Sequence, residues 1–298
     1  MFDRIVLAVD GSDEARHAAA RGLDLAEAFG AAVDALFVVD ESALRLTRSS
    51  SERERLRARG QEVLADVEAL AAERDRSITT AVVEGAPATA IGEYATENAA
   101  DAIVVGRQGM TGLGKRLLGG VTERLLRGCD VPVFVVPADD DLTPAEEDYQ
   151  TVLVPTDGSD PAAAAADYGS AIAGRTGAAL HVLNVVDVQA AGGLFSAGGL
   201  ESEFLERLEA RGHEIVDDAV ADLDAEQSTL DVTTAVERIS SHQGVAPGIR
   251  EYAEENAVDL VVMGSRGRST VGRQLLGSAA STVLRTVSVP VLVVSRAP

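Results

Sequence analysis

The stretch RIVLAVDGS at residues 4–12 recurs as TVLVPTDGS at residues 151–159. Each copy is an apolar, β-branched run that ends in Asp-Gly-Ser, a pattern typical of a buried strand followed by a turn. Two further blocks recur in the same order, 101–109 (DAIVVGRQG) with 259–267 (DLVVMGSRG) and 131–136 (VPVFVV) with 289–294 (VPVLVV). Three matched blocks in one order predict two tandem copies of a single domain.

The positions of these blocks set the predicted domain boundaries. We assign the first domain to residues 1–137 and the second to residues 151–298. Between them, residues 138–150 (ADDDLTPAEEDYQ) are acidic, contain a proline and show no periodicity, so we interpret them as a linker. A length of 298 residues agrees with two domains of common size.

Within each copy, short apolar runs alternate with longer stretches rich in Ala, Leu, Glu and Arg. In the first copy we expect strands at 4–9, 32–39, 78–83, 102–105 and 132–136, and helices at 13–29, 52–75, 88–99 and 115–128. Continuous apolar runs suit strands that are covered on both faces, and strand–helix alternation predicts a parallel sheet with right-handed crossovers. The expected fold class is α/β, with two tandem, doubly wound, five-stranded parallel-sheet domains. We expect Ser12 to cap the first helix, and Asp160 to cap its counterpart with Pro161 at the first position.

The charge balance disfavours general nucleic-acid binding. The chain has 48 Asp and Glu against 26 Lys and Arg, a formal net charge of −22, and would repel a polyanion. Six arginines lie between Arg45 and Arg59, but no aromatic residues alternate with them, so an ion-paired helix face is favoured over a nucleic-acid patch. The acid-rich, lysine-poor composition favours a halophilic source, because salt screens self-repulsion. Greatest stability at low KCl would contradict that hypothesis.

The remaining composition indicates a cytoplasmic protein. No apolar run reaches the ~18 residues of a membrane span, and the first residues do not resemble a signal peptide. The one cysteine, Cys129, excludes an internal disulfide framework and favours a reducing compartment. We interpret its thiol as buried and inert, with a redox nucleophile as the alternative.

A glycine-rich loop follows the fourth predicted strand in both copies. In the second copy it has the spacing G-x2-G-x9-G-S, from Gly264 to Ser278. Gly264 and Gly267 would let the backbone approach a ligand and adopt positive φ, and a helix that begins at Gly277-Ser278 would point free N–H groups at an anion. The side chains that add positive charge are Arg266, Arg268 and Arg273.

The first copy keeps the glycine spacing but not the serine. Gly106, Gly109 and Gly119 match the second copy, whereas Gly120 stands in place of Ser278. Two positions further on, the first copy has Thr122 where the second has Ala280. Each copy therefore retains a different one of two hydroxyl groups that could contact a phosphate.

These motifs, on a repeated strand–helix frame, resemble the universal stress protein family over nearly the whole chain. The resemblance implies a fold similar to the adenine nucleotide α-hydrolases, with ATP at the strand ends, alone or with Mg2+. It implies that the aspartate after the first strand lies near ribose or adenine, that a valine of the second strand lies at adenine, and that the loop contacts the phosphates. In the second copy it assigns Thr156, Asp157, Val185, Met263, Gly264, Arg266, Gly267, Gly277 and Ser278. In the first copy it assigns Val9, Asp10, Val38, Val105, Gly106, Gly109, Gly119 and Thr122.

Structural interpretations stand beside these assignments. Asp10 and Asp157 could instead cap the first helix or end a strand, and Asp40 and Asp187 are equally balanced between ligand and structural roles. The four histidines occupy unrelated positions in the repeat, and no base recurs at a strand end in both copies. We therefore expect no metal ligands and no catalytic residues.

The function expected from the resemblance is that of a stress-response protein that binds an adenine nucleotide, with ATP favoured, and acts as a switch or scaffold with little or no hydrolysis. The alternative is a ligand-free protein–protein interaction module of the same family, and an enzyme of similar fold is a third option. We expect no nucleic-acid or membrane partner. The last strands of the two copies are apolar and would pair within the chain, with a homodimer as a further option.

Overall fold

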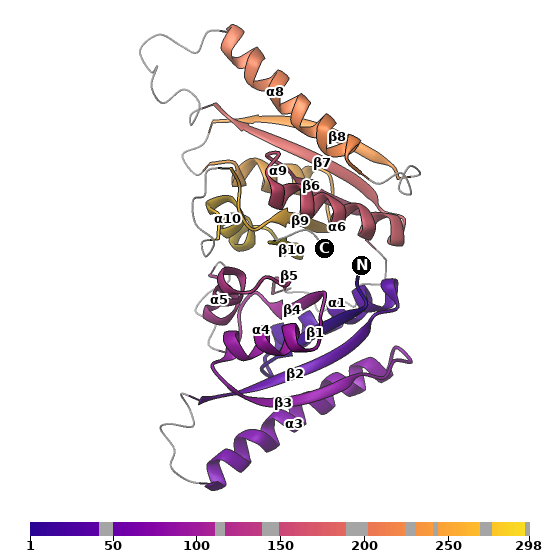
Figure 1. Cartoon of the computed structure of the whole chain (residues 1–298), viewed down its shortest axis with the longest axis vertical. Helices are drawn as coiled ribbons and strands as arrows, with labels where there is room; N and C mark the ends of the chain where they lie inside the picture. The colour runs from indigo at the N-terminus through magenta and orange to yellow at the C-terminus, as the bar shows by residue number, and fades with distance from the viewer. Residues whose placement is uncertain are drawn as a thin grey trace. The chain divides into compact units, whose positions relative to one another are not determined.

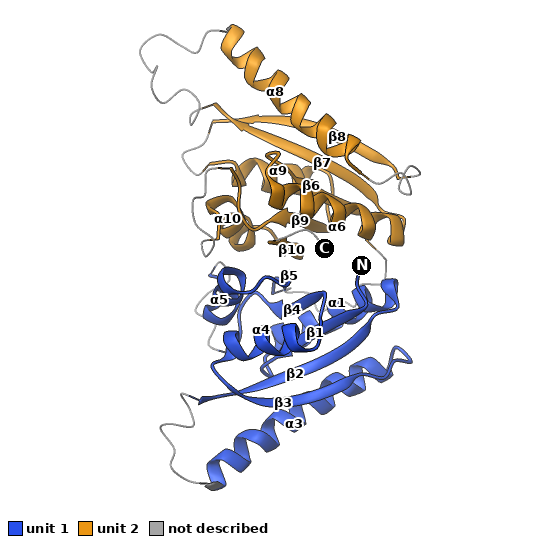
Figure 2. Cartoon of the chain, in the orientation of Figure 1, with its two compact units in different colours: residues 1–146 blue, residues 147–298 orange. Residues whose placement is uncertain are grey.

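The computed structural model describes residues 1–41, 50–110, 117–138, 149–188, 202–223, 230–240, 244–268 and 276–295. The chain divides into two compact units, residues 1–146 and 147–298 (Figure 2). Each unit is a parallel sheet covered by helices (Figure 1). Most of the expected linker, residues 139–148, lies outside the described residues.

Unit 1 has the expected alternation of strands and helices. Its elements are β1 (Arg4–Val9), α1 (Asp13–Phe29), β2 (Ala32–Asp40), α3 (Ser50–Ala72), β3 (Thr79–Gly85), α4 (Pro87–Glu97), β4 (Ala102–Gly106), α5 (Gly120–Gly128) and β5 (Val133–Val136). The strand order is β3-β2-β1-β4-β5, and neighbouring strands are parallel. Strands β2 and β3 therefore lie on one side of β1, and β4 and β5 lie on the other side.

Unit 2 repeats this arrangement. Its elements are β6 (Thr151–Pro155), α6 (Asp160–Thr176), β7 (Ala179–Asp187), α8 (Ser202–Ala221), β8 (Val232–Ile239), α9 (Ala246–Glu255), β9 (Leu260–Gly264), α10 (Ser278–Thr286) and β10 (Val291–Val294). The strand order is β8-β7-β6-β9-β10, again parallel. The prediction of two doubly wound α/β domains is confirmed.

The core lies between each sheet and its two helical layers. In unit 1, α1 packs with α3 and α4 packs with α5, so each pair covers one face, as right-handed crossovers require. All residues of β4 and β5 are buried, which explains their unbroken apolar sequences. Gly22 of α1 lets that helix approach the sheet, because a Cβ there would lie 2.5 Å from Cδ2 of Leu7.

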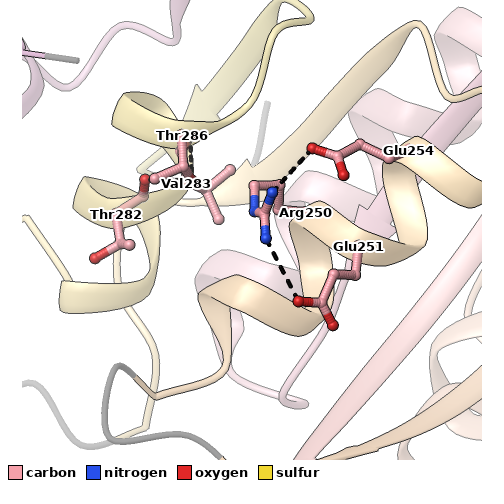
Figure 3. A network of polar contacts seen from close by, with 6 residues as sticks. All are labelled: Arg250, Glu251, Glu254, Thr282, Val283 and Thr286. Carbon is pink, nitrogen blue, oxygen red and sulfur yellow. Dashed lines mark hydrogen bonds and ion pairs between the residues drawn. The ribbon is translucent and has the colours of Figure 1, made fainter.

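Several polar groups of α9 and α10, away from the strand ends, pair within their own helix. On α9 of unit 2, Arg250 pairs with Glu254 at 3.1 Å and with Glu251 at 3.4 Å (Figure 3). On α10, the hydroxyl of Thr286 donates to the carbonyl of Thr282 at 2.9 Å. Such exposed pairs contribute little stability, so burial of the apolar strands holds the unit together.

Two expected helix starts need correction. Helix α5 begins at Gly120, and Gly119 before it is extended, with its N–H donating to the carbonyl of Arg107 at 2.8 Å. Residues 115 and 116 of the expected helix lie outside the described residues. Ser12 caps α1 as expected, with its Oγ accepting from the N–H of Ala15 at 3.1 Å. In unit 2 the N-cap of α6 is Ser159 rather than Asp160, which is the first helical residue.

Candidate functional site

In unit 1 a cavity of about 360 Å³ lies at the carboxyl ends of β1, β2 and β4, where the strand order reverses. Ligands of open parallel α/β sheets bind at this place, and small-molecule sites span roughly 300–1,000 Å³. All the residues assigned from the sequence in the first copy line the cavity: Val9, Asp10, Val38, Val105, Gly106, Gly109, Gly119 and Thr122. The fold thus brings together positions that are far apart in the sequence.

The cavity has an apolar side and a polar side. Phe37 and Val38 of β2 and Pro87 and Ile91 of α4 supply apolar lining. The turn after β1, the glycine loop after β4 and the first turn of α5 also line the cavity and supply its polar groups. An apolar wall facing a few convergent polar groups is typical of sites for small organic ligands.

The aspartate that follows the first strand ties two loops together in each unit. In unit 1, Oδ1 of Asp10 accepts from the N–H and Oγ of Ser12 at 2.9 and 2.6 Å, and Oδ2 accepts from the N–H of Met110 at 3.0 Å. In unit 2, Oδ1 of Asp157 accepts from the N–H and Oγ of Ser159 at 3.1 and 2.6 Å, and Oδ2 accepts from the N–H of Arg268 at 2.8 Å. We call this paired contact the aspartate tether.

The tether explains the second glycine of the loop motif. A Cβ on Gly109 would overlap Oδ2 of Asp10, and a Cβ on Gly267 would overlap Oδ2 of Asp157. The expectation of positive φ at Gly264 and Gly267 is wrong, and these residues instead lack a side chain because neighbouring atoms lie too close. At Gly264 those atoms belong to the backbone of Pro161, 2.8 Å from the position of a Cβ.

Each glycine loop leads into a helix, and the first backbone N–H groups of that helix have no carbonyl acceptor within it. Gly119 and Gly277 are the extended N-cap residues of α5 and α10. The next residues, Gly120 and Ser278, are both exposed. Free N–H groups and the positive end of the helix dipole favour an anion at such a position. Helix α10 begins at Ser278, as predicted.

The two hydroxyl-bearing candidates occupy different environments. Thr122 is 4% exposed, and its Oγ1 donates to the carbonyl of Gly106 at 2.9 Å. Its proton therefore holds the end of β4 against α5. Ser278 is exposed at the start of α10, while Ala280, the counterpart of Thr122, is buried without a hydroxyl.

The other residues assigned in unit 2 surround the equivalent strand ends. Thr156 is buried, and its Oγ1 accepts from the N–H of Gly158 at 3.1 Å. Met263 is buried in β9, and Val185 is half-buried in β7. Arg266 is half-buried and Arg268 is exposed, whereas Arg273 lies outside the described residues.

Comparison with known proteins identifies the chain. The model of the universal stress protein family matches residues 1–137 and 148–295. The chain belongs to the universal stress protein family. It is 40% identical over 140 residues to universal stress protein MJ0531 of Methanocaldococcus jannaschii, covering 46% of this chain and 82% of that protein. It is 31% identical over 232 residues to universal stress protein Rv2005c of Mycobacterium tuberculosis, covering 76% of this chain and 72% of that protein.

A solved structure shows the same fold over the whole length. The chain matches the crystal structure of a universal stress protein from Archaeoglobus fulgidus with a TM-score of 0.69 and 22% identity, covering 99% of each chain. The family is a stress-response family, and its domain is present here twice in tandem.

Two residues of this universal stress protein site were missed from the sequence. Glu14 of α1 accepts from the N–H of Gln108 at 2.9 Å, which fixes the start of the glycine loop in unit 1. Arg59 of α3 lines the cavity. A signal for Arg59 existed, because RLRARGQEV at 55–63 recurs as RLEARGHEI at 207–215. In that block Gly60 packs against β2, where its Cβ would lie 2.6 Å from Phe37. Gly212 packs against β8, where its Cβ would lie 2.8 Å from Val236.

The remaining sequence alternatives have structural outcomes. Arg53 and Arg57 pair with Glu84 at 3.7 and 2.8 Å, and Arg55 pairs with Glu52 at 3.5 Å, so the expected ion pairing is confirmed for these arginines. Arg45 and Arg48 lie outside the described residues.

Cys129 and the described histidines, His17, His181 and His213, are not among the residues that line the cavity, and His242 lies outside the described residues. Cys129 is half-buried rather than buried, at the end of α5, and burial raises the pKa of its thiol, which disfavours the reactive thiolate. Within the described ranges, no group of three His, Cys, Asp or Glu side chains could hold a metal ion. None of the helices in those ranges has the length and apolar character needed to cross a membrane.

Proposed function

We propose that this universal stress protein binds an adenine nucleotide, with ATP favoured, at the carboxyl ends of its sheets and acts as a nucleotide-dependent switch or scaffold in the cytoplasm. The observation that carries the proposal is the unit 1 cavity, which is lined by every residue assigned in the first copy. Glycines frame it where a Cβ would meet protein atoms, as at Gly119, where a Cβ would lie 3.2 Å from the carbonyl oxygen of Arg107. This packing sets the loop directly before the first turn of α5, whose free N–H groups favour an anion.

The two sides of the cavity match the two ends of a nucleotide. The apolar wall of Val38, Pro87 and Ile91 would pack against the flat, weakly polar base. The first turn of α5 and the glycine loop would receive the phosphates, alone or with Mg2+, which binds largely through water and phosphate oxygens. In this proposal the base lies near β2 and α4, and the phosphates lie near the glycine loop and the start of α5.

The aspartates at the site are committed to structure, which supports little or no hydrolysis. Both carboxylate oxygens of Asp10 accept hydrogen bonds from loop residues, and those of Asp157 do the same. A general base needs an oxygen free to take a proton from the attacking water. We therefore propose binding without rapid turnover.

Thermal unfolding with and without ATP and Mg2+ tests the proposal. A ligand at 100 times its dissociation constant raises the free energy of unfolding by about 2.7 kcal/mol, which shifts the midpoint measurably. Ser278→Asp should reduce the shift, because a carboxylate at the start of α10 repels phosphate. Ser288→Asp, an exposed serine beyond the other end of α10, is the matched control and should keep the full shift.

The alternative is a protein–protein interaction module without a ligand, and Gly120 in place of serine favours it for unit 1. No shift at millimolar ATP, together with no nucleotide released from the denatured protein, would support this alternative. Partners would then be sought by affinity capture with the full chain.

A further inference from the structure

Arg59 brings a positive charge to the unit 1 cavity from α3, an element outside the glycine motif. Its exposed side chain lines the cavity, and its Nη2 donates to Sδ of Met110, the residue after Gly109. A thioether is a weak acceptor, whereas a guanidinium offers five donors. The contact therefore leaves most of the hydrogen-bonding capacity of this side chain for a stronger acceptor.

The other arginines of α3 have carboxylate partners. Arg53 and Arg57 pair with Glu84, and Arg55 pairs with Glu52. Among the described residues, Arg59 contacts a thioether instead, in a chain with 48 acidic residues against 26 basic ones. Of the described residues that line the cavity, Arg59 is the cation. Its placement there is therefore distinct from the ion pairing along the rest of α3.

Unit 2 holds a guanidinium at the same place by a different route. A Cβ on Gly11, in the turn after β1, would lie 3.9 Å from Nη2 of Arg59. A Cβ on Gly158, the matching glycine of unit 2, would lie 2.7 Å from Nη2 of Arg268, and that nitrogen donates to the carbonyl of Gly158 at 3.4 Å. Arg268 belongs to the glycine loop, where unit 1 has the uncharged Met110. A guanidinium thus stands beside the same turn in both units, from α3 in unit 1 and from the glycine loop in unit 2, where Arg211 of α8 is the sequence counterpart of Arg59.

We infer that Arg59 is the phosphate-facing cation of the unit 1 site and makes that site selective for phosphorylated over unphosphorylated nucleosides. The inference rests on the proposed function, since it needs a nucleotide in the cavity. When phosphate enters, the guanidinium exchanges its thioether contact for charge-assisted hydrogen bonds to phosphoryl oxygens, with the bidentate geometry that arginine favours. Arg268 supplies the same charge to unit 2.

The test is calorimetric titration of the full chain carrying Ser278→Asp, which leaves unit 1 as the site under observation. ATP with Mg2+ and adenosine are titrated separately into this parent and into variants that add Arg59→Gln, Arg59→Lys or Arg57→Gln. Arg59→Gln should weaken ATP binding by about tenfold or more, the value of a hydrogen bond to a charged group, and leave adenosine binding unchanged. Arg59→Lys should restore part of the loss, and Arg57→Gln, which removes only an exposed ion pair, should change neither ligand.

Different failures point to different errors. Equal weakening of ATP and adenosine would show that Arg59 only shapes the cavity, and unchanged ATP binding would show that it makes no phosphate contact. Either result overturns the inference while the proposed function stands. If the parent binds neither ligand, both the inference and the nucleotide site of unit 1 are wrong.

Discussion

In unit 1 the residue after the second loop glycine is Met110, whereas in unit 2 it is Arg268, yet both backbone N–H groups donate to the aspartate that follows the first strand. The tether, the glycine positions and the strand order are the same in both units. The side chains that face the strand-end region differ in charge and polarity. We call the shared tether, glycine positions and strand order the frame. We call the side chains at the strand ends, which differ between the units, the lining.

The variable lining includes the positions that would meet phosphate. Unit 1 has Gly120 where unit 2 has Ser278, and it draws its cation from α3. Two copies with one frame and two linings suit a pair of sites that differ in nucleotide preference or affinity. Equal affinity of both sites for ATP and for adenosine would contradict that view.

The largest loss of stability is expected from substitutions that disturb the frame shared by the two units. Gly109→Ala would place a Cβ on Oδ2 of Asp10, and Gly267→Ala would do the same to Asp157. Each should lower the free energy of unfolding by about 1–3 kcal/mol, as overpacking does, with similar effects in the two units. Urea denaturation measures this loss.

The control for that prediction is Gly128→Ala, since no atom lies within 4 Å of a Cβ at Gly128. It should be neutral or slightly stabilising, because alanine favours a helix over glycine. Adding Asp10→Ala to Gly109→Ala removes the obstructing oxygen, so the double variant should lose less than the sum of the two single losses. Strict additivity would show that the glycine and the aspartate do not interact as described.

A smaller effect is expected from exchanging the lining. At Gly120 a Cβ would meet only the flexible end of Arg124, at 3.3 Å, so Gly120→Ser is sterically allowed. The added hydroxyl should tighten ATP binding in unit 1 by roughly 2–10-fold, the value of one net hydrogen bond. Gly120→Ala, titrated in the same way, separates the hydroxyl from the change in backbone flexibility, and equal affinity in both variants would rule out a serine–phosphate contact.

The smallest effect concerns a second difference between the units. Where β2 of unit 1 has Asp34, paired with Arg4 at 2.9 Å, β7 of unit 2 has His181, whose Nδ1 lies 3.0 Å from Oη of Tyr252. Burial lowers the pKa of His181 below its ordinary 6.5, and the charge of Asp231 raises it only in part. The unfolded chain therefore binds more protons just below that pH, and this histidine lowers the stability of unit 2 as the pH falls through about 6.5.

Urea denaturation at about pH 7.5 and about pH 5.5 measures that dependence. His181→Gln should flatten it slightly. His213→Gln, at an exposed position on α8, is the control for the loss of a histidine side chain. A steeper loss of stability in His181→Gln would contradict the assigned direction of the pKa shift.

Much of the frame could be read from local sequence signals. Apolar runs such as 102–106 predicted buried parallel strands, and Ser12 predicted the start of α1. Errors arose where a distant contact decided a local boundary. Residues 115–119 have a helical composition, but the bond from Gly119 to the carbonyl of Arg107 holds the end of that stretch extended. The N-cap of α6 is Ser159, one residue before the predicted Asp160.

The sequence by itself determined the repeat, the fold class, the family and eight of the residues that line the unit 1 cavity, because periodicity and glycine spacing act over short stretches of chain. Only the tertiary structure decided what those residues do to one another. The carboxylate of Asp10 meets a backbone N–H 100 positions away, and Arg59 reaches the cavity from a helix that the loop motif does not include. Such contacts depend on how the strands bring distant loops to one edge of the sheet, and no local pattern records that geometry.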